Sequence, residues 1–136
     1  MSQAVIADTG PLYATVDPTD QYHLRARQEL QQLELEGSEI TIVVSTVFET
    51  YSLILRKLSA HHARRWLREL ELGSNIIVPT AQDYHRALPV VHRFPDQDIT
   101  LFDALLLAVR DRLSLPIWTF DHHFDILGAP RWYPGV

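Results

Sequence analysis

Hydrophobic positions along the chain alternate between two kinds of pattern. Apolar and β-branched runs of strand length occur at 4–7, 40–44, 76–78 and 117–120. Between these runs, apolar residues recur at helical spacing over 22–35, 47–58, 61–72, 83–94 and 101–113. Strands that are apolar throughout and separated by helices are typical of a parallel sheet covered on both faces. The pattern therefore predicts an α/β fold with a central parallel β-sheet flanked by helices on both faces.

Proline, glycine and aromatic residues add local expectations to this pattern. Pro89 falls inside the helix expected over 83–94 and should kink or split it. Gly10 and Pro11 should turn the chain after the first strand. Trp66 should belong to the core or to a contact between subunits. The aromatic tail at 130–134 should pack either on the body of the protein or on a partner.

Length and composition limit the class of protein. The chain has 136 residues, the size of one ordinary domain, so we expect a single domain over 1–136. No run approaches the roughly 20 apolar residues of a membrane-spanning helix, and residues 1–3 lead into the first apolar run without the basic region of a signal peptide. The chain has no cysteine, which excludes disulfides and cysteine metal sites. We expect a cytoplasmic protein with no membrane partner.

Four acidic residues fall near the carboxyl ends of the expected strands. Asp8 ends the first apolar run and Asp121 ends the last. Glu49 should lie in the first turn of the helix that follows the second run, and Asp103 in the first turn of the helix over 101–113. Ligands of parallel sheets bind in the crevice beyond the carboxyl ends of the strands. The four carboxylates should therefore project into one small region.

Each acid also has a purely structural interpretation. Thr46 to Glu49 and Thr100 to Asp103 both fit the pattern of a helix start, in which the acid accepts a hydrogen bond from the N-cap amide. The two aspartates at the strand ends could be simple turn formers. For one acid alone, the structural interpretation is the stronger.

The combination of four acids favours a different interpretation. Carboxylates packed at one edge raise one another's pKa unless a cation neutralises them. Without cysteine, the natural occupant is a hard divalent ion such as Mg²⁺ or Mn²⁺, bound through carboxylates and water. Such an ion activates a water molecule and stabilises charge on a phosphate, which is the chemistry of phosphodiester hydrolysis.

At these acids the sequence resembles the PIN-domain nucleases, and in size it is most similar to the VapC-type toxins of bacterial toxin–antitoxin modules. The matching stretches span nearly the whole chain in family order and are IADTGPLYA around Asp8, STVFETYSLILR around Glu49, ITLFDALLLAVRDRL around Asp103 and IWTFDHHF around Asp121. The resemblance implies a PIN-like fold with four to five parallel strands. It also implies an Mg²⁺- or Mn²⁺-dependent endoribonuclease that cleaves single-stranded RNA.

The resemblance also suggests roles for particular residues and partners. The acidic quartet would be Asp8, Glu49, Asp103 and Asp121. Of these, Asp8, Asp103 and Asp121 would hold the metal, and Glu49 would orient or deprotonate the attacking water. The implied partners are an RNA substrate, a VapB-like antitoxin and a second copy of the chain in a homodimer.

Hydroxyl and histidine side chains surround the expected site. Thr9 and Thr119 would support it. Some family members carry a further acid two residues after the fourth one, and here that place is His123. The number of metal ions therefore stays open. Adjacent histidines such as His122 and His123 point in different directions on a regular element, which favours structural or exposed roles over a zinc site, although either ring could contact substrate beside Asp121.

The segment between Glu49 and Glu69 is basic and contains no acid. Its arginines could be a solvated pair of helix faces, with stems that cover apolar neighbours. They could instead receive RNA phosphates, for which the guanidinium fork is suited. Under the second interpretation the RNA-binding residues are Arg56, Arg64, Arg65 and Arg68.

Net charge does not decide between these functions. The chain carries 12 basic and 17 acidic residues, a net charge of −5, which by itself argues against a nucleic-acid surface. Without the quartet the balance is −1. A second function, a non-catalytic PIN-like module that binds RNA or protein, remains open, although such a module has no need for four mutually repelling acids.

Overall fold

In the computed structural model, which describes residues 3–135, four strands form one parallel sheet. The strands are β1 (Ala4–Ala7), β2 (Glu39–Val43), β3 (Asn75–Ile77) and β4 (Ile117–Trp118). Their order across the sheet is β3-β2-β1-β4, and every neighbouring pair is parallel. The predicted α/β fold and strand count are confirmed. Residues 1–2, which belong to the stretch used to exclude a signal peptide, lie outside the described residues.

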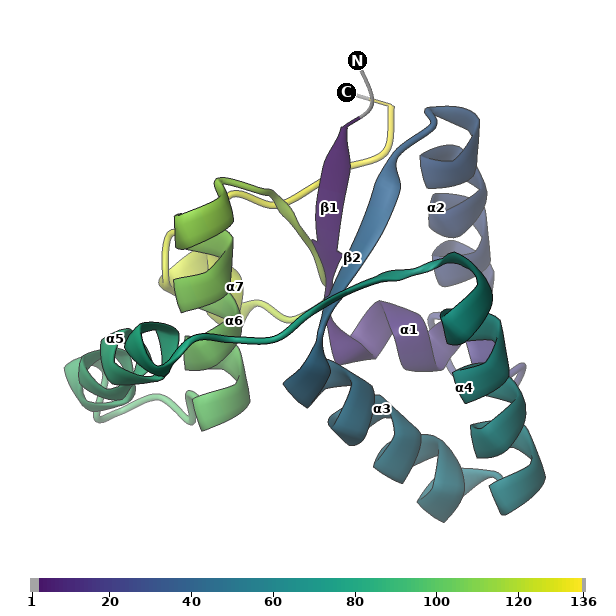
Figure 1. Cartoon of the computed structure of the whole chain (residues 1–136), viewed down its shortest axis with the longest axis horizontal. Coiled ribbons are helices and arrows are strands. Elements are labelled where there is room, and N and C mark those ends of the chain that lie inside the picture. The colour runs from purple at the N-terminus through teal and green to yellow at the C-terminus, as the bar shows by residue number, and fades with distance from the viewer. Residues whose placement is uncertain (1–2, 136) are drawn as a thin grey trace.

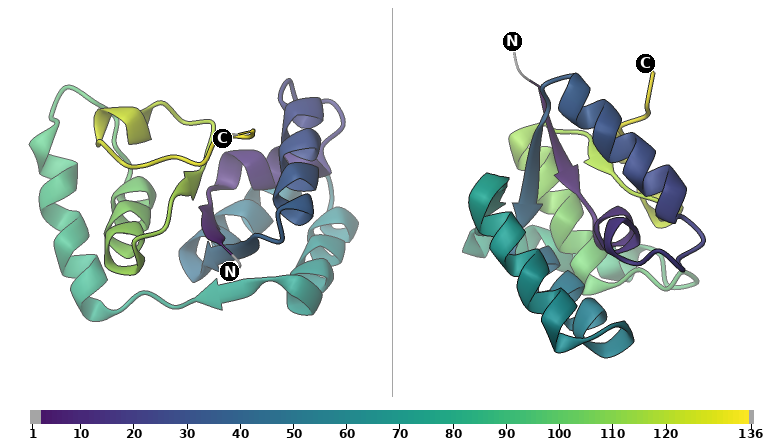
Figure 2. Two further views of the ribbon diagram at one scale, coloured as in Figure 1. Left: turned by 90° about the horizontal axis from the view of Figure 1, so that it is seen from above. Right: turned by 90° about the vertical axis from the view of Figure 1, so that its right-hand side faces the viewer.

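Seven helices in the described range connect and cover the strands. They are α1 (Thr9–Val16), α2 (His23–Leu35), α3 (Val44–Lys57), α4 (Ala60–Gly73), α5 (Ala81–Arg93), α6 (Leu101–Leu113) and α7 (His123–Ile126). Figure 1 shows α5, α6 and α7 on one side of the strands and α2 and α4 on the other. The chain passes from α4 through β3 to α5 along one edge of the molecule, as the left view of Figure 2 shows.

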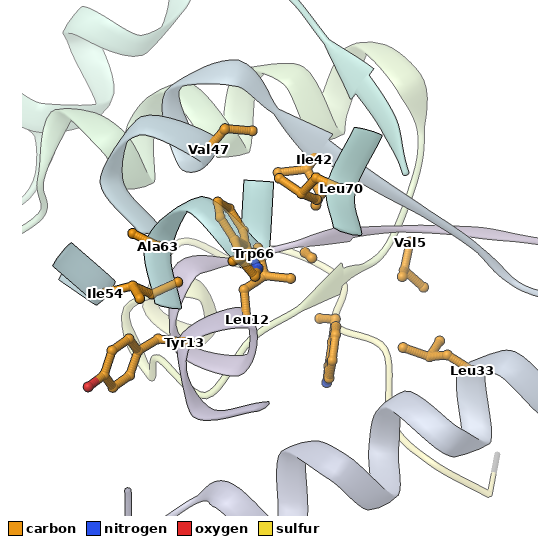
Figure 3. Packing of buried hydrophobic residues seen from close by; sticks show 12 residues of the cluster. Val5, Leu12, Tyr13, Leu33, Ile42, Val47, Ile54, Ala63, Trp66 and Leu70 are labelled. Atoms are coloured by element: carbon orange, nitrogen blue, oxygen red, sulfur yellow. The ribbon is translucent and has the colours of Figure 1, made fainter. Parts of the chain in front are cut away.

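The two faces of the sheet bury separate hydrophobic clusters. Successive strand residues point to opposite faces, so Val5 and Ala7 of β1 pack with α1 to α4, whereas Ile6 packs with α5 to α7. Figure 3 shows the first cluster, in which Trp66 packs close to Leu12 and Leu70. Trp66 therefore belongs to the core of this chain, which was the first of the two locations expected for it. The fold is a three-layer α/β/α sandwich.

The strand order places a switch point between β1 and β4. From β1 the chain adds β2 and β3 on one side, by way of α1 to α4, and then returns to add β4 on the other side of β1, by way of α5 and α6. Loops on either side of such a switch point diverge and leave a crevice at the carboxyl ends of the two strands. Asp8 follows β1 and Asp121 follows β4, so both lie at this crevice.

Two helices differ from the sequence prediction. Gly10 and Pro11 do not turn the chain, because they lie in the first turn of α1, where a missing proline N–H loses no intrahelical hydrogen bond. Helix α3 begins at Val44, directly after β2, and not at 47. Glu49 is therefore in its second turn, and the predicted first-turn position was wrong.

Other differences are smaller. Helix α5 continues through Pro89, so of the predicted kink or split the structure excludes the split. Strand β4 ends at Trp118, two residues earlier than predicted. The tail packs on the body of the protein, because Trp132 donates a backbone hydrogen bond of 2.8 Å to Ile117. In the described part of the chain, no helix is both long enough and apolar enough to cross a membrane.

Candidate active site

A pocket of about 740 Å³ lies at the switch point of the sheet. All four predicted acids line it: Asp8 directly after β1, Glu49 in α3, Asp103 in the first turn of α6 and Asp121 after β4. Four elements that are far apart in the sequence thus deliver one carboxylate each. The structure brings together the complete acidic quartet that the sequence predicted.

Asp8 is a buried carboxylate held by two hydrogen bonds. Its side chain caps α1, since the backbone N–H of Thr9 donates to one oxygen at 2.8 Å. The hydroxyl of Thr119 donates to the other oxygen at 2.8 Å. These bonds lower its pKa, but burial is the largest effect and, together with Asp103 and Glu49, raises the pKa of Asp8 to about 7. Without a cation, this carboxyl group is partly protonated at neutral pH.

Glu49 is held in the pocket by a hydroxyl group and not by a helix start. The side chain of Thr9 donates to Glu49, and the hydroxyl of Thr50 donates to that of Thr9 at 3.4 Å. Helix α3 has no side-chain cap, so the predicted capping role of Glu49 with Thr46 was wrong. Burial raises the pKa of Glu49, and so do the charges of Asp103 and Asp121.

Asp103 has both of the roles considered for it. It forms a capping box with Thr100, in which its backbone N–H donates to the Thr100 hydroxyl at 3.0 Å and its carboxylate accepts from the Thr100 N–H at 3.4 Å. It also lines the pocket, where burial and then the charge of Asp121 raise its pKa. Capping orients the carboxylate without removing it from the site.

Asp121 is fixed by two backbone contacts. Its own N–H donates to the Thr119 hydroxyl at 2.9 Å, and the N–H of His123 donates to its carboxylate at 2.9 Å. Thr119 therefore links Asp8 to the loop that carries Asp121, which gives the predicted supporting residue a defined position. The side chain of Asp121 is about one-third exposed, and it lies on the open side of the quartet.

His123 is a site residue that the sequence did not assign. Its Nδ1 atom lies 3.4 Å from Asp121 and 3.6 Å from Asp103. These three residues each offer a ligand atom within 4.8 Å of the others. His122, in contrast, is 77% exposed. The signal that could have identified His123 was its place two residues after Asp121, where the resemblance expects an acid in some members.

Basic and aromatic residues form the rim of the pocket. Arg56 and Lys57, at the end of α3, line it together with Phe48 and Phe102. Both phenylalanine rings are strongly exposed, at 66% and 46%. Of the predicted RNA-binding residues, only Arg56 lies at this rim. The other three, Arg64, Arg65 and Arg68, are on α4 and outside the pocket lining, and Arg65 pairs with Glu69 at 3.4 Å.

The chemistry of the donors fits a divalent cation. The carboxylates raise one another's pKa, and in a shared pocket this repulsion is relieved when a cation binds. The carboxylate oxygen donors suit Mg²⁺ or Mn²⁺. Asp103 and Asp121 are the carboxylates best placed for one ion, and Asp8 lies in the same pocket.

Fold and pocket together define an α/β protein with an acidic pocket at the switch point of its parallel sheet. The model of the PIN domain matches residues 5–129, and the chain belongs to the PIN domain family. No curated protein matches the sequence.

Several solved structures have the same fold. The toxin VapC20 of Mycobacterium tuberculosis, described as cleaving the sarcin–ricin loop, is 19% identical with a TM-score of 0.83, and the match covers 96% of this chain and 99% of that one. A chain of VapBC2 from Rickettsia felis, bound to promoter DNA, is 12% identical with a TM-score of 0.72 over 95% and 96% of the two chains. A chain of VapBC-1 from nontypeable Haemophilus influenzae is 13% identical with a TM-score of 0.70 over 97% and 98%.

Proposed function

We propose that the protein is an Mg²⁺- or Mn²⁺-dependent endoribonuclease that cleaves single-stranded RNA and is the toxin of a toxin–antitoxin pair. The observation that carries the proposal is the convergence of four carboxylates from four elements in one pocket of a PIN domain. Buried acids that raise one another's pKa are unfavourable in a purely structural role. They are useful where a metal ion and a water molecule must be held against a phosphate.

The residues of the pocket have different roles in the proposed hydrolysis. A bound divalent ion supplies charge stabilisation on the phosphate and lowers the pKa of water. Asp8, Asp103 and Asp121 would hold this ion. Glu49, whose pKa is raised by burial, would accept a proton from the attacking water. The Thr9 hydroxyl, which donates to Glu49, keeps that carboxylate aimed into the pocket.

The rim of the pocket suits an unpaired RNA strand. Arg56 and Lys57 provide positive charge for phosphates next to the acids. The exposed rings of Phe48 and Phe102 offer flat apolar surfaces on which unpaired bases stack, a contact worth about 1–3 kcal/mol per base. Bases within a duplex cannot make such contacts, so the rim favours single-stranded segments and loops.

Cleavage of a fluorescent single-stranded RNA with added Mg²⁺ or Mn²⁺ tests the activity. Glu49→Gln should lower kcat by at least about 100-fold, the usual contribution of a general base, without loss of folded structure. Asp125→Asn is the matched control, because Asp125 is an exposed acid paired with Arg131 at 3.0 Å, outside the pocket lining. Cleavage that persists in EDTA, or that is equal in the two variants, would contradict the proposal. RNA binding without any cleavage would support the non-catalytic alternative.

Binding measurements test the position of the RNA. Arg56→Ala should weaken binding of a single-stranded RNA and reduce the slope of log K against log salt by about 1, as expected for one lost phosphate contact. Arg68→Ala is the control, since Arg68 is equally basic but lies on α4 outside the pocket lining. A larger effect of Arg68→Ala than of Arg56→Ala would place the RNA along α4 instead.

The partner proposal rests on the solved relatives, several of which are toxin–antitoxin complexes. We expect a VapB-like antitoxin and a homodimer. Expression of the wild-type chain in a bacterium should stop growth, Glu49→Gln should not, and co-expression of a short open reading frame beside the gene should restore growth. Equal toxicity of the wild type and Glu49→Gln would contradict the proposed mode of action. Sedimentation measures the oligomeric state.

A further inference from the structure

His123 carries a buried nitrogen atom that has no hydrogen-bond partner among the described residues 3–135. It is the first residue of α7, and its side chain is 18% exposed, but its Nδ1 atom is fully buried. Leaving a buried polar atom without a partner costs about 1–3 kcal/mol. A buried nitrogen atom without a partner, close to two carboxylates, indicates a bound ligand that contacts it.

The nearest protein groups do not form a hydrogen bond with this nitrogen atom. Asp121 and Asp103 lie 3.4 and 3.6 Å from Nδ1, beyond the 2.7–3.2 Å typical of a hydrogen bond from nitrogen to oxygen. The ring centroid of His122 lies 4.6 Å from that of His123 at a tilt of 46°, but the His122 side chain is largely in solvent and makes no hydrogen bond to His123. The donor atoms of the three site residues therefore lie close together without a hydrogen bond from Nδ1 to either carboxylate.

Their separation is close to that of ligands around one metal ion. Two ligands with bond lengths of about 2.1 Å stand about 3.0 Å apart at a right angle and about 3.4 Å apart at a tetrahedral angle. The two distances at Nδ1 are near these values. The donor atoms of Asp103, Asp121 and His123 also form a group within 4.8 Å in which the third donor is nitrogen.

We propose that His123 Nδ1 is a ligand of the divalent ion held by Asp103 and Asp121, and that this nitrogen makes the site select Mn²⁺ over Mg²⁺. Mg²⁺ is a hard ion that takes oxygen ligands, whereas imidazole nitrogen favours transition metals. The inference rests on the proposed nuclease function for the presence of a metal ion. It extends that function by naming Mn²⁺ as the preferred ion.

Metal binding to the full-length protein tests this inference directly. Mn²⁺ affinity is measured from the EPR signal of the free ion, and Mg²⁺ affinity by competition. His123→Ala should weaken Mn²⁺ binding at least about tenfold, the lower range seen when even an outer partner of a metal ligand is removed, and change Mg²⁺ binding less than about threefold. His123→Asp, which replaces the nitrogen donor by an oxygen donor, should improve Mg²⁺ binding and remove the preference for Mn²⁺.

A spectroscopic readout separates ligation from a general loss of structure. Pulsed EPR of bound Mn²⁺ should show coupling to a ¹⁴N nucleus in the wild type. The coupling should disappear in His123→Ala and persist in His122→Ala, which removes the exposed neighbouring ring. Unfolding in EDTA checks that both variants are folded.

The outcomes distinguish this inference from the nuclease proposal. Nitrogen coupling from His123 without RNA cleavage supports the inference and contradicts the nuclease. Metal-dependent cleavage without nitrogen coupling, with equal Mn²⁺ affinity of His123→Ala and the wild type, overturns the inference and leaves the nuclease intact. A wild type that binds no Mn²⁺ also overturns the inference.

Discussion

Replacement of Asp8 by asparagine should stabilise the metal-free protein. The pKa of Asp8 is raised from 3.8 to about 7, mainly by burial. The folded protein therefore binds this proton more tightly than the unfolded chain, and stability decreases as pH rises from about 4 to about 7. Asparagine is neutral at every pH and removes this penalty. It also keeps a carbonyl oxygen for the Thr9 N–H and offers an amide group to the Thr119 hydroxyl.

The size of the effect follows from the pKa change. A difference of about three units at about 1.36 kcal/mol per unit corresponds to about 4 kcal/mol at pH 8, above both pKa values. At pH 5 only the interval between pH 3.8 and pH 5 contributes, which leaves about 1 to 2 kcal/mol. Below pH 4 the difference between Asp8→Asn and the wild type should vanish.

Urea unfolding in EDTA at pH 8 and pH 5 measures this difference. Asp17→Asn is the matched control, because Asp17 is also a buried aspartate, but its pKa is lowered, first of all by the hydroxyl of Tyr13, which donates at 2.5 Å. This variant should destabilise the protein at pH 8, and the loss should disappear as pH falls below the usual range of aspartate. The reasoning is refuted if Asp8→Asn is no more stable than the wild type at pH 8, or if its gain is the same at both pH values.

The same substitution separates stability from activity. Asp8 is one of the proposed metal ligands, so the more stable Asp8→Asn protein should bind the metal more weakly and lose RNA cleavage. Gains of stability at the expense of activity are expected where an active site stores unfavourable charge. A variant that cleaved RNA at the wild-type rate would exclude Asp8 from the site.

Three further predictions concern other buried polar groups and the metal. Arg112→Ala should lower the free energy of unfolding at pH 7, because it leaves the buried Asp83 without the guanidinium that donates to both of its carboxylate oxygens at 2.9 Å. The pKa of Asp83 is lowered, so the loss should vanish in acid, and a pH-independent effect would contradict this. Glu29→Met should cost about 1–3 kcal/mol in urea unfolding, since it removes the acceptor 2.8 Å from the Trp118 indole, whereas Glu29→Gln should cost less. Mn²⁺ at 100 times its Kd should stabilise the wild type by about 2.7 kcal/mol in thermal unfolding, and Asp103→Asn should reduce this gain; an equal gain would remove Asp103 from the metal site.

The sequence determined the layered fold and the position of the acids. Apolar strand-length runs between amphipathic segments lead to a parallel sheet covered on both faces, because a strand without polar positions must be buried on both sides. Parallel strands bring their carboxyl ends to one edge. Asp8 and Asp121 were therefore expected at the same edge, and they are close to one another because β1 and β4 are neighbours in the sheet.

The exact starts of helices could not be obtained from local pattern. Thr46 and Glu49 match a helix start as well as Thr100 and Asp103 do, yet only the second pair forms a capping box. Helix α3 starts directly from β2, so its first turn lies three residues earlier and Glu49 is free to enter the pocket. Gly10 and Pro11 are turn residues by propensity, but the cap provided by Asp8 makes them the start of α1.

Only the tertiary structure decided which of the remaining candidates belong to the pocket. Arg56 and Arg68 lie in one continuous basic segment of the sequence, but they are on different helices, and only Arg56 lines the pocket. His122 and His123 are adjacent in the sequence, yet one ring is in solvent and the other faces two carboxylates. The sequence by itself determined at which edge of the sheet the acids lie, because they follow the carboxyl ends of strands that all run in the same direction. The membership of the site depended on how helices from distant parts of the chain pack, and no local pattern encodes that.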